Sequence, residues 1–513
     1  MSNPQAPADH GYLSHRQILV VLAGLLAGMF LAALDMSIVG TALPRIVSDL
    51  GGLNHLSWVV TAYLLTSTSS TPLWGKISDL YGRRPMFQTA ITVFVAGSVL
   101  SALAQSMAML IGGRAIQGIG AGGLMALALS IVGDVIPPRE RGRYQGYFGA
   151  VFGFSSVSGP LVGGWFTDGP GWEWIFWINV PIGIAALVAT TIALREMPKV
   201  RREHKIDYLG AAVIVASVTA ILLYTAWAGN EYGWTDPYSL ALLAGGIALA
   251  GLFIWVEARA DEPIIPLRLF RNRVFSPTVA FTALLGIAMF GGIIFLPVYF
   301  QVVQGMTPTE SGLALVPMMA GILLTSIGSG RLMTRTGHYK VFPIVGAGVV
   351  TVAYLLLRTL GADTPYWRVG LFIFVLGAGL GFTMQTVVTA VQNAVERRDM
   401  GAATSSVAFF RTMGGAFGTA IFGAVLTSRL GHYLGEAGRA LPSEADIAND
   451  VQAIQALPPQ IHDTVVTAWV NAVQDVFLVA IPFTAIALAL AFLIPELELK
   501  QADEPITEQI LAD

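Results

Sequence analysis

Long apolar stretches alternate with short polar connections along the whole chain. Fourteen of these stretches have roughly the 20 residues that a helix needs to cross the core of a bilayer. They cover residues 18–41, 58–76, 86–106, 108–132, 144–166, 174–194, 208–227, 238–256, 277–302, 311–330, 342–360, 368–392, 402–426 and 471–494. The runs are continuous rather than alternating, so they predict helices and exclude a barrel. The predicted fold class is therefore an all-α membrane protein with fourteen transmembrane helices.

The composition supports a membrane protein and excludes several functions. Hydrophobic residues make up 54% of the 513 residues and charged residues 12%, about half the charged fraction of a soluble domain. The chain has no cysteine, which excludes disulfides and thiolate metal sites. It has no GxxxxGK[ST] phosphate loop, and its net charge of −3 gives no reason to expect nucleic-acid binding. We therefore expect no enzymatic activity, no cofactor and no metal site.

The positive charges of the connections predict the orientation. Of 29 Lys and Arg residues, the connections on one side of the membrane hold only five, namely Arg45, Arg358, Arg368, Arg429 and Arg439. The positive-inside rule then predicts that both tails, 1–17 and 496–513, are cytoplasmic. The polar N-tail lacks a basic segment, and the first apolar stretch contains an acid. We therefore expect this stretch to be a retained helix rather than a cleaved signal.

An internal repeat divides the chain into two halves. Residues 75–84 follow the second span and residues 330–340 follow the tenth, and both have two glycines seven positions apart beside basic residues. An offset of eight spans corresponds to a six-helix repeat plus two additional helices. We therefore predict a six-helix bundle over 18–194, two inserted helices with flanking cytoplasmic loops over 195–275, and a second six-helix bundle over 276–495 that includes a long outer loop at 427–470.

Two charges inside the apolar spans of the first half are the main candidates for chemistry. Asp35 lies in the first span and Arg114 in the fourth, each about 9 Å below the outer boundary of its span. A charge at this depth costs several kcal/mol and persists when it meets a partner, water or a substrate. The two could pair directly, through Gln117 or through water. The pair is assigned to proton coupling, although an ion pair that only holds two helices together remains an alternative.

A second set of residues is assigned to gating. An acid in an otherwise basic loop suggests that Asp79 forms a cytoplasmic latch with a basic residue or a helix N-terminus, whereas a purely topological role would need only the basic residues. Small residues around a mid-span proline let helices approach closely and bend. Arg411 is the charge in the spans of the second half, and it could instead snorkel to the cytoplasmic face. The gating set is Gly75, Asp79, Gly82, Arg83, Arg84, Gly153, Gly159, Pro160, Gly163, Gly164 and Arg411.

These motifs together resemble the major facilitator superfamily, and more narrowly its fourteen-helix branch of drug:proton antiporters. The resemblance covers residues 17–495 and rests on residues 34–44, 75–84, 110–123 and 149–164, with 58–64 and 175–183 in support. It implies two six-helix bundles around a central cavity, with the inserted helices at the periphery. It also implies proton-coupled efflux by alternating access in the cytoplasmic membrane of the cell.

The substrate is expected to be a small lipophilic molecule, exported by a monomer in the lipid bilayer. Candidate cavity residues are apolar, aromatic or amide side chains, namely Gln117, Phe290, Phe295, Tyr299, Phe300, Gln301, Met384 and Gln385. With a single intramembrane acid, which must also carry the proton, we expect neutral or monocationic substrates rather than divalent cations. Two alternatives remain: a dedicated exporter of one endogenous lipid or secondary metabolite, and a transporter-like sensor or scaffold.

Overall fold

The structure is a computed structural model that describes residues 15–50, 56–136, 138–194, 207–227, 232–436, 454 and 458–499. Within these ranges the regular elements are helices. The first half consists of α1 (His15–Leu50), α2 (Leu56–Tyr81), α3 (Arg83–Ala102), α4 (Met107–Val135), α5 (Pro138–Asp168), α6 (Trp174–Trp177) and α7 (Asn179–Ala193). The inserted helices are α8 (Tyr208–Trp227) and α9 (Pro237–Glu257).

The second half repeats this architecture with more interruptions. It contains η2 (Leu267–Arg271), α10 (Phe275–Val298), η3 (Tyr299–Val303), α11 (Pro308–Leu313), α12 (Val316–Thr336), α13 (Val341–Leu357), α14 (Tyr366–Met384), α15 (Thr386–Ala394), η4 (Arg397–Asp399), α16 (Met400–Glu436) and α19 (Pro459–Leu493). Each half has its own hydrophobic core, which in the second half includes Phe281, Tyr354 and Phe477 and in the first half Phe87 and Phe94.

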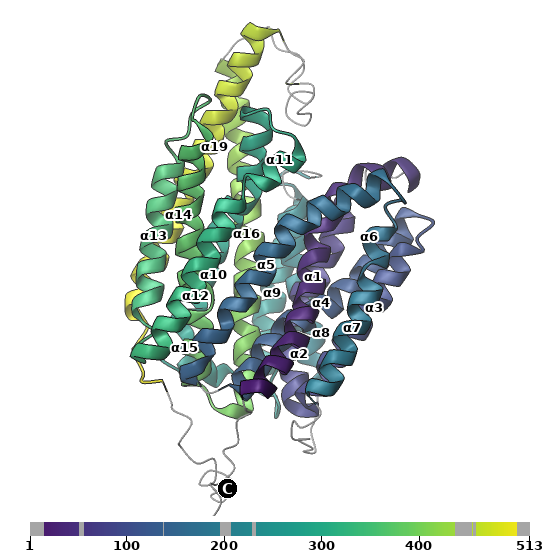
Figure 1. The fold of residues 1–513 in the computed structure, drawn as a ribbon, viewed down its shortest axis with the longest axis vertical. Coiled ribbons are helices and arrows are strands. Elements are labelled where there is room, and N and C mark those ends of the chain that lie inside the picture. Colours follow the sequence, from purple (N-terminus) through teal and green to yellow (C-terminus); the bar gives the residue numbers. More distant parts are fainter. Residues whose placement is uncertain are drawn as a thin grey trace, which may run out of the picture.

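The two halves lie side by side and meet along two pairs of helices (Figure 1). α2 packs along α16, and α5 packs along α12. α8 contacts both α2 and α16, and its residues Val213, Ile214 and Val218 share a hydrophobic cluster with Phe409 of α16. The inserted helices therefore cover one of the two boundaries between the halves.

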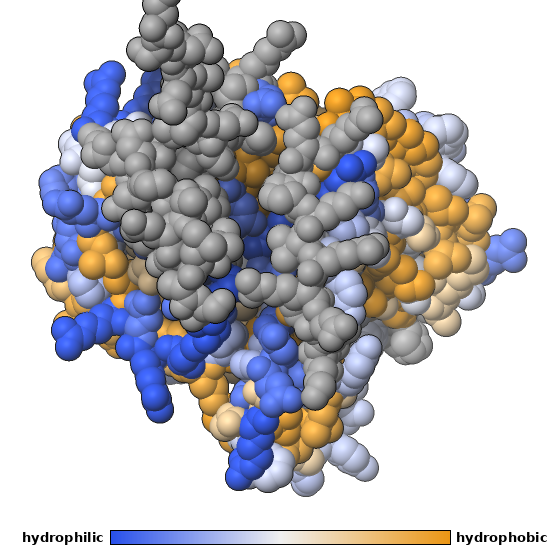
Figure 2. All heavy atoms as spheres, turned by 90° about the horizontal axis from the view of Figure 1, so that it is seen from below, coloured by the Kyte–Doolittle hydropathy of each residue, from blue (hydrophilic) through white to orange (hydrophobic). Residues whose placement is uncertain are grey.

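Eleven helical segments among the described residues are long and apolar enough to cross a membrane, and α13 is a shorter apolar helix. The molecule is thus an all-helical, multi-pass membrane protein. Figure 2 views the end at which the C-terminus lies in Figure 1, and hydrophilic side chains project from this face while apolar residues lie along its rim. This distribution is the one expected where apolar flanks meet lipid and charged loops meet water.

Several helices differ from the boundaries that hydropathy predicts. α1 continues nine residues beyond the predicted end at residue 41, to Leu50, and Arg45 and Asp49 form an ion pair one turn apart at 3.5 Å on this extension. The predicted outer loop 427–470 is shorter, because α16 reaches Glu436 and α19 begins at Pro459. Hydropathy marks the buried length of a helix rather than its hydrogen-bonded length. Within this loop, residues 437–453 and 455–457 lie outside the described part of the structure.

Candidate functional site

The two intramembrane charges of the first half form a direct ion pair. Asp35 Oδ2 lies 2.5 Å from Arg114 Nη1, which pairs α1 with α4 as their matched depth predicts. The two residues are 0% and 1% exposed, so the pair is shielded from water and lipid alike. In such surroundings an unpaired charge of either sign is costly, and each side chain fixes the position of the other.

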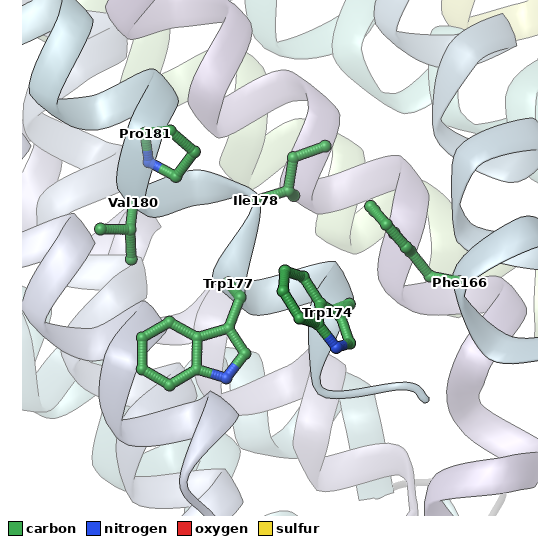
Figure 3. A pocket seen from close by; sticks show the side chains of 6 residues that line it. All are labelled: Phe166, Trp174, Trp177, Ile178, Val180 and Pro181. Carbon is green, nitrogen blue, oxygen red and sulfur yellow. The ribbon is translucent and has the colours of Figure 1, made fainter. Parts of the chain in front are cut away.

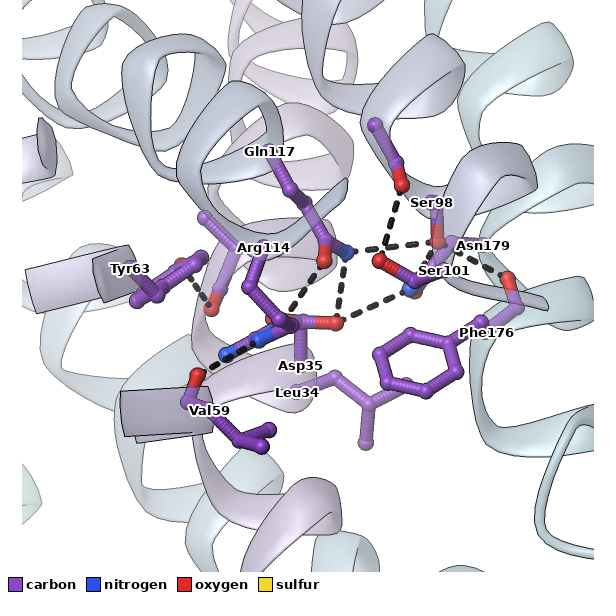
Figure 4. A network of polar contacts seen from close by, with 12 residues as sticks. Leu34, Asp35, Val59, Tyr63, Ser98, Ser101, Arg114, Gln117, Phe176 and Asn179 are labelled. Atoms are coloured by element: carbon purple, nitrogen blue, oxygen red, sulfur yellow. Dashed lines mark hydrogen bonds and ion pairs between the residues drawn. The ribbon is translucent and has the colours of Figure 1, made fainter. Parts of the chain in front are cut away.

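Neutral polar side chains complete the coordination of Asp35, and Figure 4 shows them converging on its carboxylate. Gln117 Nε2 donates to Asp35 Oδ1 at 2.7 Å, and Asn179 Nδ2 donates to the same oxygen at 3.1 Å. Ser98 Oγ accepts hydrogen bonds from both amides, at 3.2 and 2.9 Å, and donates to the carbonyl of Phe176 at 2.9 Å. Gln117 Oε1 in turn accepts from Arg114 Nη1 at 2.7 Å. We call Asp35, Arg114, Gln117, Asn179 and Ser98 the Asp35 network.

The guanidinium of Arg114 is also held on its remaining sides. Its Nε donates to the carbonyl of Val59 at 3.2 Å, and its Cζ lies 4.2 Å from the ring centre of Tyr63. Tyr63 is itself buried and donates to the carbonyl of Ala32 at 3.3 Å. A lysine would provide the charge but neither the planar stacking nor the several directed donors.

The Asp35 network lies on α1, α3, α4 and α7, and its hydrogen bonds to the carbonyls of Val59 and Phe176 connect it to α2 and α6 as well. Sequence reasoning identified Asp35, Arg114 and Gln117 but not Ser98, Asn179 or Tyr63. Asn179 is a carboxamide inside an otherwise apolar stretch, and that isolated polarity was the signal available for it.

A second polar cluster joins the two halves at the opposite end of α2. The carboxylate of Asp79 accepts from the backbone N–H groups of Gly401 and Ala402, at 3.1 and 3.0 Å, in the first turn of α16. A helix N-terminus has free N–H groups and a positive dipole end, so it favours a carboxylate. Arg83 Nη1 lies 2.6 Å from Asp79 Oδ1, and Arg83 Nε lies 2.6 Å from Asp134 Oδ2 of α4. We call Asp79, Arg83, Asp134 and the first turn of α16 the latch.

Two glycines beside the latch, Gly75 and Gly82, are required by close helix packing and by backbone conformation. A Cβ atom at Gly75 would lie 2.6 Å from the carbonyl oxygen of Gly401, so only glycine lets α2 approach α16 this closely. Gly82 has a φ of 95° between the end of α2 and the start of α3, a conformation that favours glycine. Arg84 is half-buried beside it, without an ion-pair partner in the described part of the chain.

Burial changes the protonation of the latch. It raises the pKa of Asp79 to about 6, and the positive charge of Arg83 opposes this increase. When the latch is open and Asp79 faces water, its carboxyl would ionise in the ordinary range. The closed latch therefore binds the proton more tightly, and linkage favours closure as the pH on that side falls through about 6.

Replacing Asp79 with alanine is expected to open the latch end of the boundary between the halves. The change removes two acceptors from the first turn of α16 and leaves Arg83 with one acidic partner. The chain has no cysteine, so Ser326→Cys would introduce a single thiol, at a buried position of α12 beside α5. We expect maleimide to label this thiol several-fold faster with Asp79→Ala than without it. Arg84→Ala is the matched control. Equal labelling rates for Ser326→Cys alone, with Asp79→Ala and with Arg84→Ala would contradict a latch role for Asp79, and the loop would then serve only to orient the chain in the membrane.

The repeat of the loop in the second half has a neutral residue at the position equivalent to Asp79. Thr334 occupies the place of Asp79, and its hydroxyl donates to the carbonyl of Gly330 in its own helix at 2.9 Å. Gly337 ends α12 with a φ of 75°, as the glycine pattern predicts. The second half thus lacks an acid at the position equivalent to Asp79.

The small residues of α5 serve two different contacts. Gly159 packs on α1, where a Cβ would meet the hydroxyl and Cβ of Ser37, and Ser37 Oγ donates to the carbonyl of Ser155 at 2.8 Å. Gly153 faces Met319 of α12 at ordinary contact distance, and Gly163 is buried. A Cβ at Gly164 would meet open space. Pro160 lies within α5, and its side chain is outside the described part of the structure.

The candidate cavity residues of the second half divide into two groups. Phe295, Tyr299 and Phe300 are buried in the hydrophobic core of that half, and Tyr299 donates to the carbonyl of Gly361 at 2.9 Å. Their role in this conformation is packing rather than lining, because the helix turns these rings toward their own half. Gln301 Nε2 donates to Ser311 Oγ at 3.0 Å. The second group, Phe290, Met384 and Gln385, lies near α16 or at the junction of α14 with α15.

A pocket of about 400 Å³ lies at the junction of α6 with α7, beside the end of α5 (Figure 3). Its lining is apolar and largely aromatic, and consists of Phe166, Trp174, Trp177, Ile178, Val180 and Pro181. None of the residues predicted to line a cavity is among them. The pocket therefore gives no support to that set.

Comparison with known proteins agrees with the fold. A model of the Major Facilitator Superfamily matches residues 25–419, and the chain belongs to this family of transporters. It is 41% identical over 482 residues to an uncharacterised transporter of the family from Mycobacterium tuberculosis, covering 94% of this chain and 70% of that protein. It is 39% identical over 429 residues to the multidrug transporter protein MdtP of Bacillus subtilis, covering 83% and 78%.

Two further similarities bear on substrate and fold. An MFS-type transporter of the acurin A biosynthesis cluster in Aspergillus aculeatus is 37% identical over 407 residues, which covers 78% of this chain and 73% of that protein. The solved structure of the proton:xylose symporter XylE has a TM-score of 0.61 at 14% identity and covers 96% of this chain and 98% of XylE. At this identity the symporter shares the fold alone.

Proposed function

We propose that the protein exports lipophilic small molecules by antiport with protons, through alternating access, as a multidrug transporter. The observation that carries this proposal is the Asp35 network, in which a titratable carboxylate and a permanent cation are fully buried among membrane helices. Protonation of Asp35 would remove the charge that Arg114 pairs with, and the helices joined by the network would then be free to rearrange.

The proposed membrane arrangement has fourteen crossings, typical of the drug:proton antiporter branch. We propose that α2, α5 and α13 cross the bilayer together with the eleven segments already described. The positive charges of the loops favour cytoplasmic tails and a cytoplasmic position for the latch. The protein would act as a monomer in the cytoplasmic (inner) membrane.

The placement of the network and the latch supports alternating access. The latch is closed in this structure, so the end of the boundary that bears Asp79 is sealed. We propose that substrate leaves from this state toward the opposite side, that protonation of Asp35 follows, and that opening of the latch returns the site to the cytoplasm. The energy of the proton gradient is thereby transferred to the substrate.

Transport of a fluorescent lipophile into inverted membrane vesicles tests the proposal directly. With an imposed proton gradient, acid inside, we expect accumulation of the dye above its equilibrium level. Collapse of the gradient by an ionophore is expected to release it. Equal dye levels with and without the gradient, in vesicles that contain folded protein, would refute proton coupling.

A dedicated exporter of one endogenous product is the second candidate. The similarity to a transporter of a biosynthesis cluster favours it, because such a position suggests a single secondary metabolite. A panel of unrelated dyes and lipophilic drugs distinguishes the two functions. Efflux of many unrelated compounds supports the multidrug function, whereas efflux of one chemical type supports the dedicated exporter.

A further inference from the structure

Arg411 is a permanent cation inside the second half, and no acid in the described part of the chain forms an ion pair with it. It lies eleven residues into α16, roughly 16 Å from the first residue of that helix, and is partly buried. Among the described residues its side chain makes no hydrogen bond or ion pair, whereas Arg429, farther along the same helix, pairs with Asp475 at 3.3 Å. Neither α10 with η3 nor α14 with α15 contains an Asp or Glu. A guanidinium at this depth needs a compensating partner.

The packing of α15 against α16 places Gln385 at the depth of Arg411. The two helices are joined by residues 395–399 and run in opposite directions, and Gln392 Nε2 lies 3.4 Å from Thr404 Oγ1. Gln385 precedes Gln392 by seven residues, and Arg411 follows Thr404 by seven residues in α16. Both therefore lie on the membrane-interior side of this contact. Seven residues return an α-helix almost to the same face. Gln385 and Arg411 therefore lie on the faces that carry Gln392 and Thr404.

That face is turned toward the boundary between the halves. Gln392 Nε2 also donates to the carbonyl of Leu129 in α4, at 2.9 Å. Residues two turns farther along the same face are therefore expected to lie toward the region between the halves.

Gln385 itself has unused hydrogen-bonding capacity. It is only 7% exposed, and its Oε1 has no hydrogen-bond partner. Gln385 lies at the break between α14 and α15. On one side of this break α15 packs on α16, and on the other side α14 packs on α12 and α13. A buried amide oxygen without a partner is costly, so a hydrogen-bond donor is expected to reach it in another state of the transport cycle.

An apolar surface lies one turn away from the guanidinium. Gly415 follows Arg411 by four residues, and a Cβ there would lie 2.5 Å from the ring of Phe290 on α10. The ring of Phe290 therefore lies directly on the backbone of α16 beside the charged position. A cation next to an aromatic surface suits a ligand that has one anionic group and a lipophilic body.

We propose that Arg411 and Gln385 bind the anionic group of exported carboxylate-bearing lipophiles, with Phe290 against the lipophilic body. Gln385 Oε1 accepts from the guanidinium and its Nε2 donates to the carboxylate, so both side chains are satisfied when the substrate is bound. This inference rests on the proposed efflux function and specifies its substrate class. It replaces the monocationic preference expected from the sequence, because the charge of Asp35 is already offset by Arg114 whereas that of Arg411 is not.

Binding and transport of a matched pair of probes test the proposal. Pyrenebutyrate carries a carboxylate, and its methyl ester has nearly the same shape without the charge. For the purified full-length protein we expect pyrenebutyrate to bind at least tenfold more tightly than the ester. Arg411→Gln is expected to remove this difference by weakening binding of the acid, while the affinity for the ester stays unchanged. Arg411→Lys keeps the charge without the planar fork and is expected to be intermediate. Arg429→Gln removes a cation from the exposed part of the same helix and is the matched control.

The outcomes separate this proposal from the proposed function. Equal affinities of the wild-type protein for acid and ester would overturn the anion site, even if a proton gradient drives efflux of neutral dyes. An equal loss of affinity for the acid and the ester in Arg411→Gln would also overturn the anion site and indicate a structural role for Arg411. Preferential binding of the acid with no gradient-driven transport of either probe would instead contradict proton-coupled efflux and leave the anion site supported.

Discussion

Replacing Asp35 with asparagine is expected to abolish substrate accumulation driven by a proton gradient. Asparagine keeps the shape of the side chain and can still accept from Gln117 or Asn179, but it cannot gain or lose a proton. Downhill exchange of labelled for unlabelled substrate needs no proton and is expected to persist at a measurable rate. Gradient-driven accumulation and substrate exchange, measured in the same inverted vesicles, distinguish loss of coupling from loss of transport.

The control for this variant addresses folding. Asp35→Asn leaves Arg114 without its ionic partner, and breaking a buried pair costs about 3–5 kcal/mol. Thermal unfolding and elution as a single species therefore accompany the transport measurement. Asp49→Asn changes an exposed acid on the same helix, which pairs with Arg45, and is expected to behave as wild type. Gradient-driven accumulation by folded Asp35→Asn would show that another group carries the proton.

Arg114→Lys is expected to reduce coupled transport at least tenfold although the charge is retained. The lysine ammonium would keep one contact with Asp35 but lose the bond to the carbonyl of Val59 and the stacking on Tyr63. Hydrogen bonds to charged groups contribute about 1.5–3 kcal/mol each, and about 1.4 kcal/mol corresponds to tenfold in rate. Initial efflux rates over a range of pH measure the effect. A wild-type rate and pH profile in Arg114→Lys would contradict a specific role for the guanidinium.

The Asp35 pair and the latch loop could be located from sequence because charged residues are rare in apolar spans. Asp35 and Arg114 stood out in continuous hydrophobic runs, and counting residues from the span ends placed them at one depth. Asp79 stood out because an acid interrupts a basic loop. In each case a residue type that is costly at its position marked a contact that the folded chain provides.

The partners of these residues could not be derived in the same way. Ser98 and Asn179 are neutral, and their inclusion depends on how α3 and α7 rotate toward α1. The aromatic residues Phe295, Tyr299 and Phe300 have the composition expected of a substrate cavity, yet they pack in the core of their own half. Hydropathy does not distinguish a ring that faces a cavity from one that faces a neighbouring helix, because both are shielded from water.

The position of Arg411 shows the same limit for a charged residue. Its distance from the start of the span was compatible with snorkelling to the cytoplasmic face. α16 begins at Met400, which puts Arg411 roughly 16 Å along this helix, and the contact between Gln392 and Thr404 leads us to infer that Gln385 lies at a similar depth. Depth along one helix follows from sequence, whereas the neighbour at that depth depends on the register between two helices.

Proton release on substrate binding is the most direct test of the central claim, that Asp35 exchanges a proton for substrate. The purified protein, in a weakly buffered solution with a pH indicator, is titrated with a transported lipophile. The account predicts that protons are released in proportion to the bound substrate by the wild-type protein, and that Asp35→Asn binds substrate without releasing them. Substrate binding to the wild-type protein with no proton release at any pH, or undiminished release from Asp35→Asn, would contradict it.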